Sequence, residues 1–430
     1  MQATVLTRRL GLFERAAARF NRDTPFNAAV SVTLRGALDG PTLRRALTAT
    51  VLNNPIMTMV PSRGSFVPAA LAEPAFEELE GDDQVLARAT DELLNDCPGK
   101  RGGAPVRARL VHGDDATALL ICAPHYLVDA VSLAQLLFAT LAPQHDDGVR
   151  RPLTPAPDAR FPQNFNGWRG VAAAARYGAR QMGEEIAARR DPGAAAIAIP
   201  KPGRTRHRAL KISADDLASL SKACRRHGAT LNGALAAAVS RVFLQRLQHR
   251  DHGLVRLMSF CDLRRRVTPR LTNNELGAAL AITRHLINVE AGEDWRNATA
   301  ISRTIDTSTK RGEHFCATLL APTMMRIAFG TRAMRLADVA VSLPVLTWPK
   351  AAWASRILDF RGYVSVTPLA PPISVIAALS RAGLTMSFMY LDSEFSDETM
   401  APLCEETGSL LGAMAAEPMK ANGRGALNTA

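Results

Sequence analysis

Apolar residues follow two different rhythms along the chain. Short continuous runs, at 119–123 and 254–261, are typical of strands that are buried on both faces of a sheet. Other stretches repeat apolar residues every three or four positions, at 41–52, 133–141 and 230–247, which indicates helices with one buried face. This alternation predicts an α/β protein, and 430 residues suggest two domains rather than one.

The first half is expected to contain an early strand at 29–34, a helix at 41–52 capped by Asp39, and a helix at 83–95. Runs at 106–111 and 117–124 flank a Gly-Asp-Asp turn and predict a hairpin. The second strand of this hairpin ends at His125, and we expect Ser132 to cap the helix that follows. His125 thus lies between a buried strand and a helix, a common place for a catalytic side chain.

The second half restarts with a strand at 209–212. Ser213, Thr230 and Ser396 are expected N-caps of helices, a further helix is expected at 295–310, and paired strands at 373–379 and 384–391. Between the halves, 142–208 is rich in Pro, Gly, Ala and Arg, with one helix near 171–188. We therefore predict an N-terminal lobe at 1–175, a linker at 176–208 and a C-terminal lobe at 209–430.

The candidate chemistry lies at 124–132, Pro-His-Tyr-Leu-Val-Asp-Ala-Val-Ser, which contains a His-x-x-x-Asp pattern formed by His125 and Asp129. The pattern alone is weak evidence, because a histidine satisfied by hydrogen bonds beside a turn-capping aspartate fits it equally well. No Gly-x-Ser-x-Gly elbow is present to support a serine hydrolase.

Segment 124–132 resembles the His-His-x-x-x-Asp-Gly or His-x-x-x-Asp motif of the condensation-domain and BAHD-like acyltransferases. Pro124 stands in the place of the first His, and Ala130 in the place of the Gly. The order of the predicted elements resembles that family too, above all at 259–266 and 372–414. The resemblance implies an α/β fold of two chloramphenicol-acetyltransferase-like lobes, each with a mixed sheet flanked by helices, and an active-site tunnel between them.

The resemblance also implies roles for single residues. His125 would be the general base, and Asp129 would form a structural ion pair with the arginine of an Asp-Leu-Arg segment, here Arg264. An exposed cluster with the two arginines that follow is the alternative for Arg264. Five further positions are expected beside the motif or the tunnel: Tyr126, Ala130, Ser132, Asn274 and Gly277.

The implied reaction moves an acyl group from a thioester, either acyl-CoA or a phosphopantetheinyl carrier protein, to an alcohol in secondary-metabolite or lipid biosynthesis. A single histidine can serve as base and then as acid, so we expect neither a metal nor a bound cofactor. Two alternatives stay open. One is an amide-forming free-standing condensation enzyme with an amine acceptor. The other is a catalytically weak member that binds an acyl group or carrier protein. Pro124 and Ala130 favour it, since both depart from the longer motif and the Ala130 methyl group limits close approach.

The net charge of +12 favours anionic partners such as CoA, an acidic acyl carrier protein or anionic lipid. We expect no nucleic-acid partner, since aromatic residues make up only 5% of the chain and no recognition motif appears. Six cysteines without a Cys-x-x-Cys pair fit a reducing compartment. With no signal peptide and no apolar run long enough to span a bilayer, we expect a cytoplasmic protein.

One segment at 317–348 mixes apolar residues with Arg326, Arg332 and Arg335. Such a helix would suit peripheral membrane contact or the roof of an acyl tunnel. A core helix whose arginines reach out to solvent is the alternative.

Overall fold

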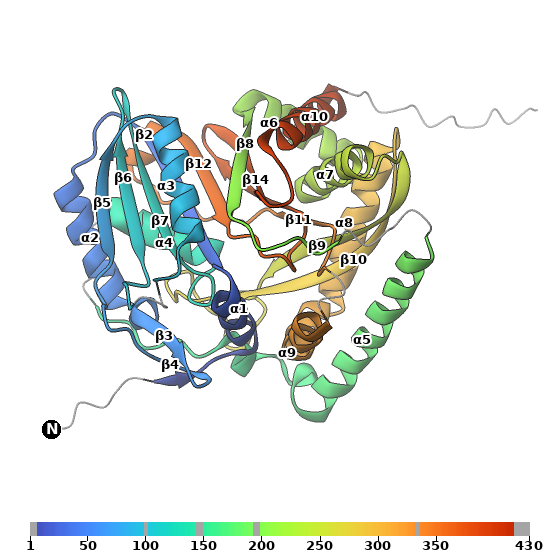
Figure 1. Ribbon diagram of the computed structural model, residues 1–430, viewed down its shortest axis with the longest axis horizontal. Coiled ribbons are helices and arrows are strands. Elements are labelled where there is room, and N and C mark those ends of the chain that lie inside the picture. Colours follow the sequence, from blue (N-terminus) through green and yellow to red (C-terminus); the bar gives the residue numbers. More distant parts are fainter. Residues whose placement is uncertain (1–6, 99–101, 143–148, 192–197, 332–334, 417–430) are drawn as a thin grey trace, which may run out of the picture.

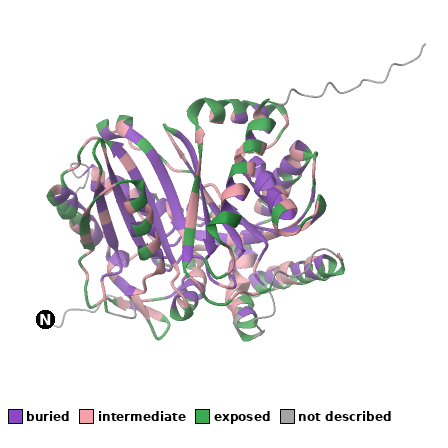
Figure 2. Ribbon diagram, turned by 45° about the horizontal axis from the view of Figure 1, so that its top comes forward, coloured by how far each residue is buried: buried purple, intermediate pink, exposed green. Residues whose placement is uncertain are grey.

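The structure is a computed structural model that describes residues 7–98, 102–142, 149–191, 198–331 and 335–416. Two lobes lie side by side, each built on one large sheet (Figure 1). Buried residues are concentrated in the sheets, and exposed residues lie on the outer faces of the helices (Figure 2). This arrangement confirms the predicted α/β class with two lobes of mixed sheets flanked by helices.

The first sheet has five strands in the order β12-β2-β7-β6-β5. They are β12 (Ile357–Val364), β2 (Asn27–Arg35), β7 (Ala116–Pro124), β6 (Arg107–His112) and β5 (Ala75–Glu80). Its helices are α2 (Gly40–Asn53), α3 (Asp83–Asn95) and α4 (Ala130–Leu141). A small sheet lies beside it, formed by β1 (Arg8–Arg9), β4 (Ser65–Pro68) and β3 (Met59–Ser62), and α1 (Leu12–Asp23) precedes β2.

Strand β7 is buried on both faces, as its continuous apolar sequence predicts. Leu119 and Ile121 pack into the core cluster that holds α2 and α4. Leu120 and Cys122 point the other way, into the cluster beneath α3. This double burial makes β7 a rigid support for the residue that follows it.

The second sheet has six strands in the order β10-β9-β11-β13-β14-β8. They are β10 (Leu280–Glu290), β9 (His252–Asp262), β11 (Val339–Ser342), β13 (Ile373–Ser380), β14 (Gly383–Leu391) and β8 (Thr205–Ser213). Its helices are α6 (Ala214–Arg226), α7 (Leu231–Leu247), α8 (Asp294–Lys310) and α10 (Asp397–Ala416); α5 (Gly167–Arg190) and α9 (Glu313–Thr331) lie together at its edge (Figure 1). Within the described ranges, no helix combines the length and apolarity needed to cross a membrane.

The two lobes do not follow the predicted boundaries cleanly. Strand β12 belongs to the second half of the sequence, yet it pairs antiparallel with β2 and completes the first sheet. The predicted linker at 176–208 also contains the second half of α5, which packs against α9 and β10. The helix expected near 171–188 is α5, and it runs across the predicted boundary between the N-terminal lobe and the linker.

Two local predictions need correction. Helix α4 begins at Ala130 and is capped by Asp129, whose side chain accepts a hydrogen bond from the Ser132 N–H. Ser132 therefore is not the cap, because a better acceptor lies three residues earlier. Arg335 does not lie on a polar helix face: it follows α9, is buried, and forms an ion pair with Glu394 at 2.6 Å. Arg332 lies outside the described residues.

Candidate active site

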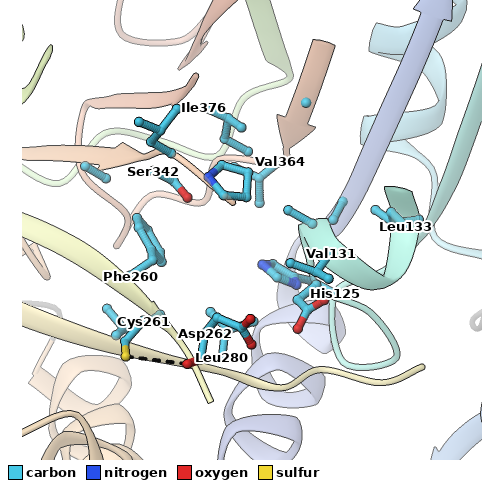
Figure 3. A pocket seen from close by; sticks show the side chains of 18 of the residues that line it. His125, Val131, Leu133, Phe260, Cys261, Asp262, Leu280, Ser342, Val364 and Ile376 are labelled. Carbon is cyan, nitrogen blue, oxygen red and sulfur yellow. Dashed lines mark hydrogen bonds between the residues drawn. The ribbon is translucent and has the colours of Figure 1, made fainter. Parts of the chain in front are cut away.

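A cavity of about 680 Å³ lies between the two lobes, at the end of β7. One wall comes from β2, β12 and the start of α4, and the opposite wall comes from β9, β10, β11 and β13 (Figure 3). Most of the lining is apolar, including Phe260, Leu280, Val364 and Ile376. The cavity thus offers space for an apolar group beside the residue that ends β7.

That residue is His125. Its backbone N–H donates to the Phe26 carbonyl at 2.9 Å, which continues the pairing of β7 with β2. Its Nδ1 lies 2.7 Å from the Val128 carbonyl oxygen. A carbonyl oxygen only accepts, so Nδ1 carries the proton in this bond, and a neutral ring then keeps its lone pair on Nε2. The ring points into the cavity (Figure 3).

Aromatic neighbours hold the His125 ring in this orientation. Phe13 approaches it edge-on, with ring centroids 5.6 Å apart, and Phe26 lies 5.1 Å away at a tilt. Burial lowers the pKa of His125 below its usual value, against the opposing effects of the Val128 carbonyl and the Asp129 charge. The ring is therefore neutral at pH 7, the form that a general base requires.

Asp129 does not bond to His125. Its two oxygens accept from Arg264 in a bidentate pair, at 2.7 and 3.0 Å, and from the backbone N–H groups of Ser132 and Ala279 at 2.8 and 2.9 Å. Burial alone would raise the pKa of Asp129, but Arg264 and these N–H groups hold it below its usual range. With every oxygen engaged, Asp129 is a structural anion rather than a proton acceptor.

Arg264 is itself buried, with 1% of its surface exposed. Besides Asp129, it donates to Ser132 Oγ at 2.7 Å and lies 3.1 Å from Asp262. The Asp129–Arg264 pair inferred from the resemblance is thus present, and it joins the start of α4 in the first lobe to the end of β9 in the second. It fixes the loop from His125 to Asp129 against the opposite wall of the cavity.

Residues 201–396 match the model of a family described as the C-terminus of phthiocerol/phthiodiolone dimycocerosyl transferase. No curated protein sequence gives a match. The fold is similar to that of trichothecene 15-O-acetyltransferase from Fusarium sporotrichioides, with 12% identity, TM-score 0.72 and 95% of each chain covered. The first condensation domain of the calcium-dependent antibiotic synthetase gives 15% identity and TM-score 0.70, with 96% of this chain and 98% of that chain covered.

Polyketide synthase associated protein 5 from Mycobacterium tuberculosis gives 18% identity and TM-score 0.64, with 97% of this chain and 99% of that chain covered. The chain therefore has the two-lobed chloramphenicol-acetyltransferase-like fold, and its second half is similar to an acyltransferase family. At these identities the solved structures establish the fold, and the family match supports the enzyme class. The predicted superfamily, fold and acyltransferase class are confirmed.

The remaining residues predicted for the site are divided between the cavity wall and its support. Ala130 lines the cavity. Ser132 and Gly277 lie behind the wall: Ser132 Oγ donates to the Gly277 carbonyl at 2.8 Å and accepts from the Gly277 N–H at 2.9 Å. Gly277 has φ +153°, a conformation that favours glycine. The pair ties α4 to the turn that leads into β10.

Tyr126 and Asn274 lie apart from the cavity. The Tyr126 ring is buried in the core of the first lobe, 6.1 Å from the Phe66 ring, and burial raises the pKa of its phenol. Asn274 is exposed on the 272–277 turn, whereas its neighbour Asn273 lines the cavity. A one-residue shift in a turn is beyond what sequence spacing can resolve, because a turn has no fixed side-chain period.

Sequence reasoning missed several polar groups of the site. The Val128 carbonyl fixes the histidine tautomer, but a backbone group leaves no mark in a sequence. Ser342 ends β11 with its hydroxyl in the cavity (Figure 3). Thr367 also lines the cavity, and its buried hydroxyl makes no hydrogen bond with any described residue. A serine that ends an apolar run, as Ser342 does, is the one signal that the sequence offered.

Proposed function

We propose that this protein transfers an acyl group from a CoA or carrier-protein thioester to a hydroxyl group, with His125 as the general base. The observation that carries the proposal is the Nδ1 hydrogen bond to Val128. It leaves the lone pair of Nε2 available in a mostly apolar cavity that opens between two lobes.

The proton path needs only this one ring. Nε2 takes the hydroxyl proton of the acceptor as its oxygen attacks the thioester carbonyl carbon. The C–O bond forms, and the carbonyl π electrons move onto its oxygen. When that oxyanion collapses, the C–S bond breaks, and the imidazolium returns the proton to the departing thiolate, so that free thiol and ester leave.

The ion pair supports this chemistry without entering it. Because Asp129 accepts four hydrogen bonds, it has no lone pair directed at His125. Its role in the proposal is to cap α4 and to anchor the loop that carries Val128, so that the base keeps its tautomer. Ser342 supplies a hydroxyl in the same cavity as a candidate hydrogen-bond donor to the developing oxyanion.

Two observations bear on the donor. Several of the structurally similar proteins are, by their names, domains of polyketide or nonribosomal synthesis machinery or proteins associated with it. This supports a carrier-protein donor in general terms. A net charge of +12 suits a carrier protein or CoA alike, since both are anionic. The apolar cavity lining suits the acyl chain.

The test is thiol release from a panel of acyl-CoA and acyl-carrier thioesters of short and long chain, with pooled alcohols and amines as acceptors. His125→Ala is compared with wild type, and His112→Ala serves as control because His112 lies on β6, outside the cavity lining. We expect acceptor-dependent release that His125→Ala loses and His112→Ala retains. Equal release by all three proteins would remove His125 from the reaction, and tight thioester binding without release would favour the binding-protein alternative.

A further inference from the structure

Helix α5 carries apolar residues on its outer surface that no other part of the described chain covers. Trp168 is 76% exposed, Val171 70%, Met182 61% and Ile186 46%. Their positions differ by 3, 11 and 4 residues, close to whole helical turns, so they form one stripe along α5. This apolar stripe runs the length of a helix that lies at the edge of the molecule (Figure 1).

The polar residues beside the apolar stripe are cationic. Arg169, Arg176 and Arg190 are exposed on α5, and the Arg169 guanidinium lies 5.8 Å from the centre of the Trp168 ring. The only carboxylates of α5, Glu184 and Glu185, are half-buried or buried and pair with arginines. The outer face of α5 therefore combines a row of apolar side chains with positive charge alone.

The apolar surface continues onto α9. Gly178 of α5 lies against Leu320 of α9, where an added Cβ would be 3.2 Å from the leucine methyl. Met324 and Ile327 follow Leu320 on the same helical face and are 39% and 49% exposed. Ala328 follows Met324 by one turn of α9 and packs into the cluster that contains Phe20, a residue of the cavity wall. Helix α9 thus joins this exposed surface to the packing that supports the cavity wall.

We propose that the outer face of α5, continued by α9, binds an anionic lipid surface. An apolar stripe with a tryptophan near one end and arginines along its flank is the pattern of a helix that lies in the membrane interface. A second copy of the chain is disfavoured as the occupant, because two such faces would oppose their arginines. The site would place the acyltransferase cavity next to a lipid surface, but the binding itself does not depend on catalysis.

The test uses the whole chain and flotation with two kinds of vesicle, phosphatidylcholine alone and phosphatidylcholine mixed equally with phosphatidylglycerol. The apolar variant is Val171→Ser with Met182→Ser and Ile186→Ser, and the charge variant is Arg169→Gln with Arg176→Gln. Matched controls are Leu71→Ser, an exposed leucine outside both helices, and Arg88→Gln with Arg225→Gln on α3 and α6. Thermal unfolding confirms that every variant is folded.

We expect wild type to bind the anionic vesicles, with its tryptophan emission shifted to the blue as the exposed Trp168 ring leaves water. The charge variant should bind about tenfold or more weakly, since each arginine near an anionic surface strengthens the binding. The apolar variant should lose a similar factor, and the controls should not. No binding by wild type, equal binding by all variants, or equal binding to both vesicles would overturn the proposal. So would a concentration-dependent dimer that the apolar variant abolishes.

Discussion

His125 has one nitrogen fixed by a backbone carbonyl and the other directed into an apolar cavity. If Nε2 is the base, His125→Ala should lower kcat about 10²- to 10⁴-fold, the usual contribution of general acid–base catalysis. KM for the thioester should change little, because the side chain is asked to move a proton rather than to bind the donor. Steady-state kinetics on the best thioester measures this, and a fall in kcat below tenfold would contradict the assignment.

The pH profile gives a second, independent test of His125. Burial lowers the pKa of His125 from its usual value of about 6.5. The ring therefore stays neutral, the form that can act as a base, at pH 7 and down to a pH below that usual value. We expect kcat/KM to be flat on the neutral side and to fall only at a pH below about 6.5. The His125 ring binds a proton more readily in the unfolded chain than in the folded one. The free energy of unfolding should therefore decrease as the pH falls through the pKa that this ring has in the unfolded chain. A fall in kcat/KM that begins above pH 7 would be inconsistent with this environment.

The Asp129–Arg264 pair should behave as one unit. Asp129→Ala or Arg264→Ala leaves the partner charged and buried, which typically costs about 3–5 kcal/mol of unfolding free energy. The double variant should cost clearly less than the sum of the two, since neither charge is then stranded. Urea unfolding of the four proteins completes the cycle. Additive losses would mean that the two groups do not interact, against the geometry.

Much of this residue-scale picture was accessible from the sequence only through the family resemblance. From their spacing alone, His125 and Asp129 fit two interpretations equally well. One is a catalytic motif, and the other is a histidine satisfied by hydrogen bonds beside an aspartate that caps a turn. The pair with Arg264 joins positions far apart in the chain, which no periodicity can reveal. The role of Val128 depends on a carbonyl, and any residue type has one. What remained visible locally was the buried strand that delivers His125.

Among the elements, helix starts were predicted best. Asp39, Ser213 and Thr230 each accept a backbone hydrogen bond as the expected N-cap. The start of α4 was predicted too late in the sequence. Its apolar repeat begins after Asp129, which pointed to Ser132 as the cap, whereas Asp129 caps the helix. Strand β12 was missed altogether. Its sequence mixes Asp359 and Arg361 with apolar residues, and these two charges bond to each other in the interior.

Gly362 of β12 provides a prediction at the scale of elements. A Cβ at this position would lie 2.8 Å from Ile376 Cγ2 on β13, and both residues line the cavity. Gly362→Val should therefore narrow the cavity where the two lobes meet, at a packing cost of about 1–3 kcal/mol. Under the proposed function, turnover of long-chain thioesters should fall by about tenfold or more relative to acetyl-CoA. Gly362→Ala should show a smaller effect in the same chain-length series, and an unchanged preference would place the acyl group elsewhere.

The two lobes are held together by contacts between segments that are far apart in the sequence. Strand β12 completes the first sheet from the second half of the chain, and Asp129–Arg264 bridges the lobes at the cavity. The cavity exists because the two sheets face each other across these links, with one wall from each lobe. The sequence predicted two lobes from composition, but a strand that crosses between them carries no compositional signal.

This crossing leads to a prediction about autonomy. A fragment of residues 1–175 contains the whole predicted N-terminal lobe but lacks β12, so β2 becomes a bare edge. In the full chain Phe360 lies opposite Val32, and Tyr363 lies opposite Ala29. The fragment would leave Val32 and Ala29 without these partners. We expect the fragment to unfold without a cooperative transition and to bind a hydrophobic dye, whereas the full chain unfolds cooperatively. Thermal unfolding followed by circular dichroism distinguishes them. A sharp transition in the fragment, near the midpoint of the full chain, would show that the lobe folds alone and does not need β12.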